Sequence, residues 1–172
     1  MKRLPEASFA EFLEYFPALD LPFSLLPDMS QIPSDPVPLP GMLQETYILP
    51  FESDEIDEYT EYVPYGQISG TQGFHAIIYW KAGVLRYEFI LATYSLQGDP
   101  LSHAIVGGLR YEEEGALHSV AVIHEDLSII IAEGIAQEDE SMLDPGQTQT
   151  YQMSIQPTGM ITYETNEEEK EE

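Results

Sequence analysis

Short apolar runs and alternating apolar and polar positions fill the stretch from Gly73 to Glu133. The run Gly73–Trp80 is apolar on both parities, which is typical of a strand covered on both faces. A Gly-containing turn, Lys81–Gly83, follows it. From Val84 to Tyr94 the pattern alternates, which predicts a half-solvated strand. One face of this strand carries Leu85, Tyr87, Phe89 and Leu91.

Further runs have the same spacing, and turn residues bound each of them. Gly107–Gly108 is expected to end the run Leu101–Val106. Pro64 places another segment, Glu61–Ser69, near a sheet edge. The chain therefore predicts a mainly β fold: an antiparallel meander of about seven or eight strands over residues 61–164, forming a sandwich or a partly open barrel. The runs are Leu101–Val106, Leu117–Ile123, Leu127–Ile135 and a final hairpin, Tyr151–Tyr163.

A short helix is predicted within residues 1–17. Ser8 and Glu11 match a capping box, and Pro17 ends the pattern. The helix would carry an apolar stripe at helical spacing, formed by Phe9, Phe12, Leu13 and Phe16. We expect this stripe to pack on the sheet; a docking helix for another protein is the alternative.

Residues 18–50 are rich in proline and also in apolar side chains. Proline interrupts helices and sheet ladders, so an extended arm wrapped over the domain is expected. The segment Ile32–Pro40 is alternatively a ligand for an aromatic groove. Glu45–Leu49 is a candidate short strand. We interpret residues 1–165 as a single β-domain, followed by a flexible acidic tail over residues 166–172.

The chain is strongly acidic, with 6 basic and 31 acidic residues among 172 and a net charge of −25. No Lys or Arg occurs between Leu4 and Trp80. A field of this sign repels phosphate, so neither a nucleic acid nor an anionic membrane is expected as a partner. The charge has two interpretations that composition does not separate: solubility, or attraction of a basic protein.

The sequence lacks the residues or motifs that several kinds of catalysis and of nucleotide binding require. The chain has no Cys, and it contains no Gly-x-Ser-x-Gly elbow, phosphate loop or dinucleotide fingerprint. Of the four histidines, His118 and His124 would lie roughly 20 Å apart on one strand, whereas His75 and His103 could meet across strands. We predict no catalytic residue, no metal site and no cofactor, and binding residues stay unknown.

The segment Phe51–Tyr59 is densely acidic and supplies oxygen ligands of the kind that calcium prefers. Its candidate ligands are Asp54, Glu55, Asp57 and Glu58. The EF-hand spacing is missing, so a solvated loop is the expected structure.

The segment Tyr87–Tyr94, a turn at Gly98 and the pair Gly107–Gly108 form a pattern that resembles uncharacterised bacterial proteins of the β-meander type. Glu125–Glu133 resembles the next recurring strand, and Tyr151–Tyr163 resembles the ending of that family. The resemblance covers residues 86–163. Its members have no assigned activity, so it implies a fold and transfers no site.

These observations favour a non-catalytic acidic interaction protein, of an inhibitor or immunity type, that binds a basic protein partner. A small apolar-ligand binding β-barrel is the alternative, and a metal- or carboxylate-dependent enzyme is the second alternative. The proposed ligand-lining aromatics are Tyr79, Trp80, Tyr87, Phe89 and Tyr94.

The sequence also bears on location. No apolar run approaches 18 residues, and Pro5 and Glu6 interrupt any signal-peptide core. We therefore expect a cytoplasmic protein. Its oligomeric state does not follow from the sequence.

Overall fold

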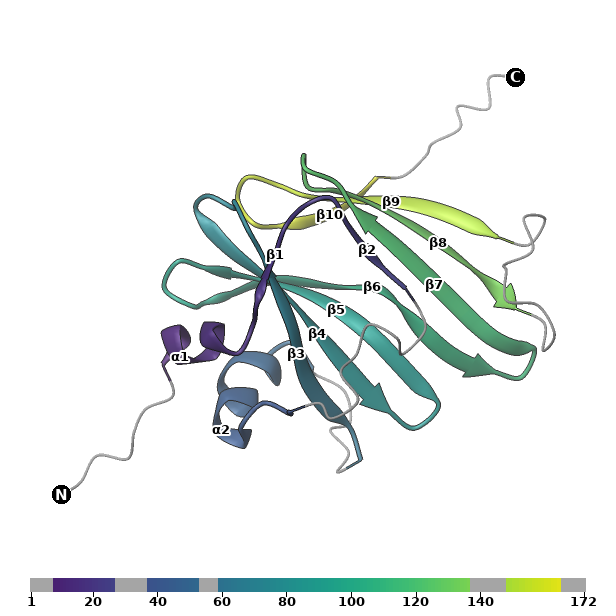
Figure 1. Ribbon diagram of the computed structural model, residues 1–172, viewed down its shortest axis with the longest axis horizontal. Coiled ribbons are helices and arrows are strands. Elements are labelled where there is room, and N and C mark those ends of the chain that lie inside the picture. Colours follow the sequence, from purple (N-terminus) through teal and green to yellow (C-terminus); the bar gives the residue numbers. More distant parts are fainter. Residues whose placement is uncertain (1–7, 27–36, 53–58, 137–147, 165–172) are drawn as a thin grey trace.

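One curved sheet of ten strands organises the molecule (Figure 1). The structure is a computed structural model, and it describes residues 8–26, 37–52, 59–136 and 148–164. The strand order is β1-β3-β4-β5-β6-β7-β8-β9-β10, with β2 paired to β7. The central strands are β3 (Glu61–Ile68), β4 (Phe74–Gly83), β5 (Arg86–Ser95), β6 (Pro100–Glu112), β7 (Gly115–Ile123), β8 (Ser128–Ala136), β9 (Gln149–Ile155) and β10 (Ile161–Glu164).

The predicted mainly β, antiparallel architecture is confirmed, and the sheet is an open one. The strand number exceeds the prediction because the proline-rich arm adds two short strands. β1 (Ala18–Leu19) pairs in parallel with β3, and β2 (Phe23–Leu25) pairs with β7. The arm therefore joins the sheet at two places, although its prolines led us to expect an extended cover without ladder pairing.

The sheet curls until its last hairpin approaches its middle. The Thr93 hydroxyl on β5 donates a 2.6 Å hydrogen bond to the carbonyl of Gly159, in the β9–β10 turn. The amide of Ile161 donates to the Ser102 hydroxyl on β6 at 3.2 Å. These two bonds join the β9–β10 hairpin to β5 and β6.

The concave face of the sheet holds the larger core. Its side chains alternate with outward-facing ones along each strand, as a pleated sheet requires. The predicted face of β5 is confirmed for three of its four residues, because Phe89 and Leu91 are fully buried and Tyr87 packs against them. The prediction is wrong for Leu85, which lies in the turn before β5 and is exposed. The partners of this face include Leu25 from β2, Ile78 and Trp80 from β4, and Ile129 and Ile131 from β8.

A second core lies on the opposite face of β4 and β5. The helix α1 (Phe9–Glu14) packs its aromatic stripe there, with Phe12 and Phe16 buried, so the expected packing on the sheet is confirmed. The Ser8 hydroxyl accepts the amide of Glu11 at 3.1 Å, which is the N-cap half of the predicted capping box. Tyr79, Ile90 and Tyr94 meet this layer from the sheet.

Two expectations about this outer layer are wrong. The candidate strand Glu45–Leu49 is helical: α2 (Gly41–Leu43) continues into the π-helical turn η2 (Gln44–Ile48). Burial of Tyr47 and Ile48 against the sheet outweighs the strand propensity of this short run. As a result β5 is covered on both faces along most of its length, and it is not the half-solvated strand that its alternation predicts.

Two predicted turn positions also differ. β4 runs through Lys81–Gly83, and the turn falls at Val84 and Leu85 instead. Gly107–Gly108 do not end their strand, because β6 continues to Glu112. The register between β5 and β6 shifts immediately before these glycines, which marks a β-bulge.

Several predictions fall on residues that the structure does not describe. They are the calcium candidates Asp54, Glu55, Asp57 and Glu58, most of the Ile32–Pro40 segment, and the acidic tail. Among the residues that are described, no helix has both the length and the apolar character needed to cross a bilayer.

Candidate functional site

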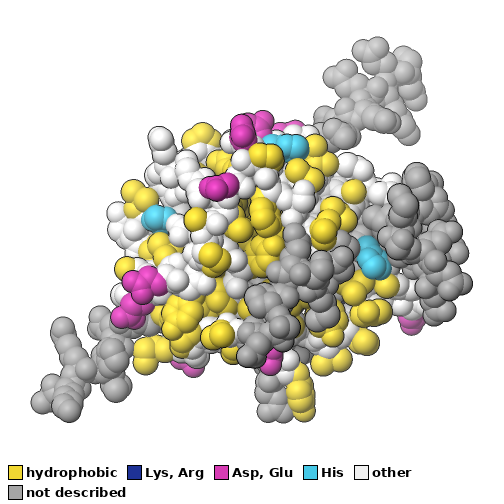
Figure 2. Space-filling model, viewed as in Figure 1, with side chains coloured by type: hydrophobic (Ala, Val, Ile, Leu, Met, Phe, Trp, Pro, Cys, Tyr) yellow, Lys and Arg dark blue, Asp and Glu magenta, His cyan; other side chains and the backbone are white. Residues whose placement is uncertain are grey.

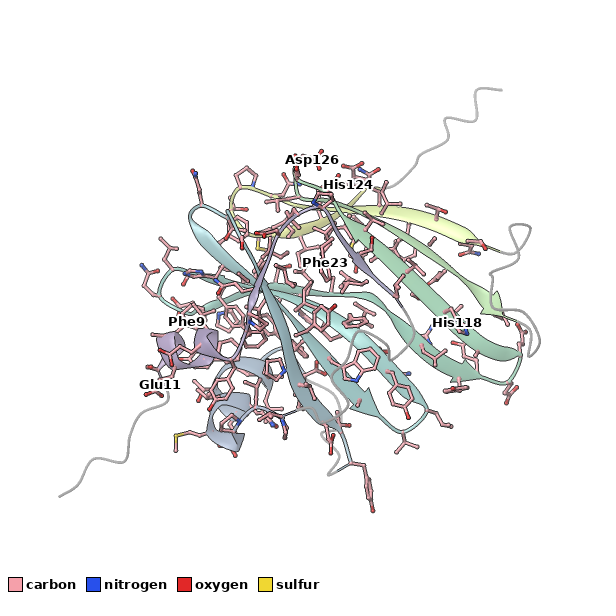
Figure 3. All side chains as sticks on the ribbon, in the orientation of Figure 1. Phe9, Glu11, Phe23, His118, His124 and Asp126 are labelled. Carbon is pink, nitrogen blue, oxygen red and sulfur yellow. The ribbon has the colours of Figure 1, made fainter. Side chains whose placement is uncertain are left out.

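The four histidines are placed separately. His118 lies within β7, and His124 directly follows the last residue of that strand (Figure 3). His75 shares a 3.1 Å hydrogen bond with the amide of Gln67 and packs on Phe9, whereas His103 packs on Phe51. Across the described ranges, no three His, Asp or Glu side chains form a group able to hold a metal ion.

The aromatic residues considered for an apolar ligand are core residues. Tyr79 and Tyr94 belong to the outer core under the helices, and Trp80 and Phe89 belong to the concave core. Tyr87 stacks on Trp80 at a centroid distance of 6.0 Å. None of the five lines the pocket described next.

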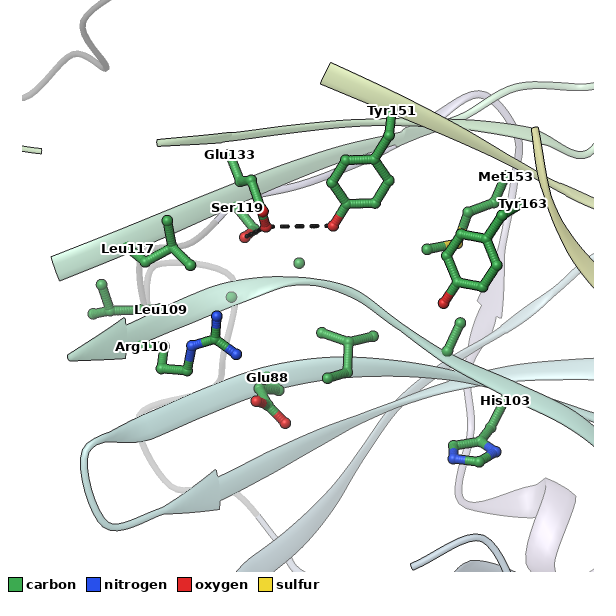
Figure 4. Close-up of a pocket in the computed structure, with 14 residues that line it drawn as sticks. Glu88, His103, Leu109, Arg110, Leu117, Ser119, Glu133, Tyr151, Met153 and Tyr163 are labelled. Carbon is green, nitrogen blue, oxygen red and sulfur yellow. Dashed lines mark hydrogen bonds between the residues drawn. The ribbon is translucent and has the colours of Figure 1, made fainter. Parts of the chain in front are cut away.

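A pocket of about 430 Å³ opens in the curled half of the sheet (Figure 4). Its walls come from six consecutive strands, β5 to β10. Apolar side chains include Leu109, Leu117 and Met153. The polar side chains of the wall are Glu88, His103, Arg110, Ser119, Glu133, Tyr151 and Tyr163.

Register explains why polar groups collect at this end. On β8, Ile129, Ile131 and Glu133 share one face, because side chains alternate along a strand. Ile131 lies in the concave core opposite Ala121, and the next inward pair along the ladder is Glu133 with Ser119. The concave face is thus apolar over one part of β7 and β8 and polar over the adjoining part.

Glu133 is the centre of a hydrogen-bond network in the pocket. Its Oε2 accepts the Ser119 hydroxyl at 3.2 Å and the Tyr151 hydroxyl at 3.3 Å (Figure 4). Both donors are neutral. Among the described residues, no Lys, Arg or His lies within ion-pair distance of this carboxylate.

The other charged side chains of the pocket do have charged partners. Arg110 Nε lies 2.9 Å from Glu112 Oε1, and Glu88 Oε1 lies 3.5 Å from Arg86 Nε. Glu88 is only 5% exposed. It lies across Gly108 from Ser119, since Gly108 pairs with both residues on neighbouring strands.

Tyr151 reflects this environment. Burial raises the pKa of its hydroxyl to about 12, and the charge of Glu133 and the hydrogen bond to it act in the same direction. The nearby Arg110 opposes the increase. Tyr151 therefore stays protonated near neutral pH and acts as a hydrogen-bond donor to the carboxylate.

Sequence reasoning did not find this pocket. The available signal was parity: Glu133 continues the face of Ile129 and Ile131, and Ser119 continues the face of Ala121. When a polar residue occupies a strand position whose side chain faces the core, either the strand is close to its end or the side chain lines a cavity. The contributions of β6, β9 and β10 depend on the curl of the sheet, which no local pattern contains.

No protein-family model matches this chain, and no curated protein or solved structure matches it either. The resemblance to uncharacterised bacterial β-meander proteins therefore stays a prediction. The site has to be interpreted from its own geometry.

Proposed function

We propose that this protein is a non-catalytic interaction protein that binds a basic protein partner, as an inhibitor or immunity-type protein does. The observation that carries the proposal is the pairing of the described Lys and Arg side chains with carboxylates of the same chain. The described residues include three Lys or Arg side chains, and each is paired with a carboxylate of the same chain. The excess of carboxylates has no internal counter-charge.

The matched pairs are Lys81 with Glu52, Arg86 with Glu88, and Arg110 with Glu112. The Lys81 pair is largely enclosed, because the same Glu52 accepts the Tyr79 hydroxyl at 2.9 Å. No Lys or Arg of the described chain is visible on the face in Figure 2, where acidic groups and apolar side chains lie interspersed. Such a surface complements a basic protein and accelerates the encounter with it.

Salt dependence tests the proposal. The purified chain is immobilised, proteins from the source lysate are captured at low salt and eluted at high salt, and the captured protein is then purified. Its dissociation constant with the chain is measured at both ionic strengths. We expect one basic protein whose dissociation constant rises at least about tenfold with salt, because screening weakens attraction between charged surfaces.

A control separates specific binding from ion exchange. An unrelated protein of similar net positive charge should bind at least about tenfold more weakly than the captured partner under the same conditions. Equal binding of both proteins, or binding that is indifferent to salt, would contradict the proposed function.

A small-ligand protein is the second candidate, and the pocket favours it. A volume of about 430 Å³ lies within the range of small-molecule sites. Its two carboxylates, one guanidinium and two phenols suit a polar ligand, however, and not the apolar one considered first. An enzyme that uses Glu88 and Glu133 is a further hypothesis, and no observation favours it over binding.

A further inference from the structure

Glu133 is a carboxylate on the concave wall whose hydrogen-bond partners are two neutral hydroxyls. The cation in the same pocket, Arg110, is already paired with Glu112, and the second carboxylate, Glu88, is already paired with Arg86. The pocket therefore carries one net negative charge, located at Glu133. A carboxylate in a recessed site is stabilised by a cationic partner, and none of the Lys and Arg side chains that the structure describes lies within ion-pair distance of Glu133.

We propose that the pocket receives one Arg or Lys side chain of the basic partner, with its guanidinium or ammonium group at Glu133. The inference rests on the proposed function and assigns it a site. Leu117 and Met153 provide apolar surface for the aliphatic stem of such a side chain. The rings of Tyr151 and Tyr163 border the same space and favour a cation over a neutral group.

The geometry argues against an anionic occupant. An anion would enter against a net charge of −25 and would face Glu133 and Glu88 within the pocket. Arg110 does not offset this, because one guanidinium faces two carboxylates in the pocket; its Nε lies 2.9 Å from Glu112 Oε1, although this buried Nε makes no hydrogen bond. In protein interfaces, arginine side chains in enclosed pockets commonly contribute much of the binding energy.

Capped amino acids test the pocket without the partner. N-acetyl-arginine amide and N-acetyl-lysine amide are titrated into the full-length chain and followed by NMR. N-acetyl-norleucine amide provides the stem without charge, and N-acetyl-glutamate amide provides the opposite charge. We expect saturable shifts at the Met153 and Leu117 methyl groups with the two cations. Equal shifts with norleucine amide, stronger shifts with glutamate amide, or no saturable shift would overturn the inference.

A matched pair of variants tests the role of Glu133. Glu133→Gln removes the charge and leaves a carbonyl oxygen to accept the Ser119 and Tyr151 hydroxyls. Glu125→Gln removes the same charge from an exposed turn. We expect at least about a tenfold loss of arginine-amide affinity for Glu133→Gln and less than about a twofold loss for Glu125→Gln. Equal losses of affinity in the two variants would show that the ligand responds only to the overall negative charge of the protein, and this would overturn the inference.

The wild-type titration keeps the inference testable even if Glu133→Gln does not fold. The partner complex then separates the two proposals. If a salt-sensitive basic partner binds Glu133→Gln as tightly as wild type, the pocket is not its site and only this inference fails. If the capped cations bind at Glu133 and no basic protein is captured, the cation pocket stands for a free ligand and the proposed function fails.

Discussion

The hydroxyl of Tyr94 donates a 2.6 Å hydrogen bond to the backbone carbonyl of Tyr47. Tyr94 lies on the outer face of β5 and Tyr47 lies in η2, so the bond joins the sheet to the helical layer that covers it. Both side chains belong to the buried outer core. This single polar contact lies within an aromatic cluster that also contains Phe9 and Phe12.

Tyr94→Phe should destabilise the fold by about 1–3 kcal/mol, because the ring is kept while a buried carbonyl loses its donor. Tyr111→Phe is the control, since Tyr111 is 49% exposed and its change should stay within about 0.5 kcal/mol. Urea unfolding of both variants measures the difference. Equal stabilities of wild type and Tyr94→Phe would show that the Tyr47 carbonyl finds another donor.

Gly108→Ala should cost roughly 3 kcal/mol or more, or prevent folding. Gly108 has a φ of 129°, and a Cβ there would lie 2.0 Å from the carbonyl oxygen of Tyr87. Gly41→Ala is the matched control, because its Cβ would meet nothing within 4 Å. Thermal unfolding compares the two, and a Gly108→Ala protein as stable as Gly41→Ala would contradict the requirement for glycine at position 108.

Leu85→Asn should stabilise the chain by roughly 1 kcal/mol. Leu85 has a φ of 59° in the β4–β5 turn and is 61% exposed, and asparagine tolerates this backbone region better than a bulky side chain. Val84→Asn is the control in the same turn, because Val84 does not have a positive φ. Urea unfolding of the two variants gives the comparison. A gain of the same size for both would show that it comes from replacing an exposed apolar side chain and not from the backbone angle of Leu85.

Stability should fall as pH rises above the usual tyrosine pKa of about 10. Burial raises the pKa of Tyr79 and Tyr94 well above that value, and burial with Glu133 raises the pKa of Tyr151 to about 12. The unfolded chain then releases protons that the folded chain retains, so the free energy of unfolding falls with pH. The stabilisation is complete below pH about 10 and is lost as pH rises through the folded-state values.

Circular dichroism and tyrosinate absorbance, recorded together on an alkaline titration, check this expectation. Buried tyrosines should ionise in the same cooperative step that removes the β signal. Ionisation of every tyrosine before any loss of structure would contradict it. Tyr151→Phe, which removes one of the raised groups, should make the decline in stability shallower between pH about 10 and 12.

The strand sequence from β3 to β10 could be predicted because each strand carries its own period and its own turn residues. Leu117–Ile123 and Leu127–Ile135 correspond closely to β7 and β8. The covered outer face of β5 could not be predicted. Its alternation is that of a half-exposed strand, and only the packing of η2 and α1, distant in sequence, buries Ile90, Ala92 and Tyr94 on that side.

The pocket could not be predicted for a related reason. Glu133 and Ser119 are neighbours through one ladder, which parity suggests, but Tyr163 and His103 join them only because the sheet curls. The curled half of the sheet contains the bulge between Ile105 and Gly107, and the hydrogen bond between Thr93 and Gly159 ties its last hairpin to β5. Glycines within a strand pattern are compatible with a β-bulge and with the end of the strand. Gly107–Gly108 were predicted to end their strand, whereas the structure has a bulge before them and β6 continues.

The pairing of β2 with β7 has a consequence for the order of events during synthesis. Phe23 and Leu25 leave the ribosome early, whereas their partners Ile123 and Ala121 are added only after four further strands of the sheet have been made. A domain generally folds as a unit, and here the segment that forms β2 cannot pair until the seventh strand has been made. Until then Phe23 and Leu25 lack the strand against which they pair.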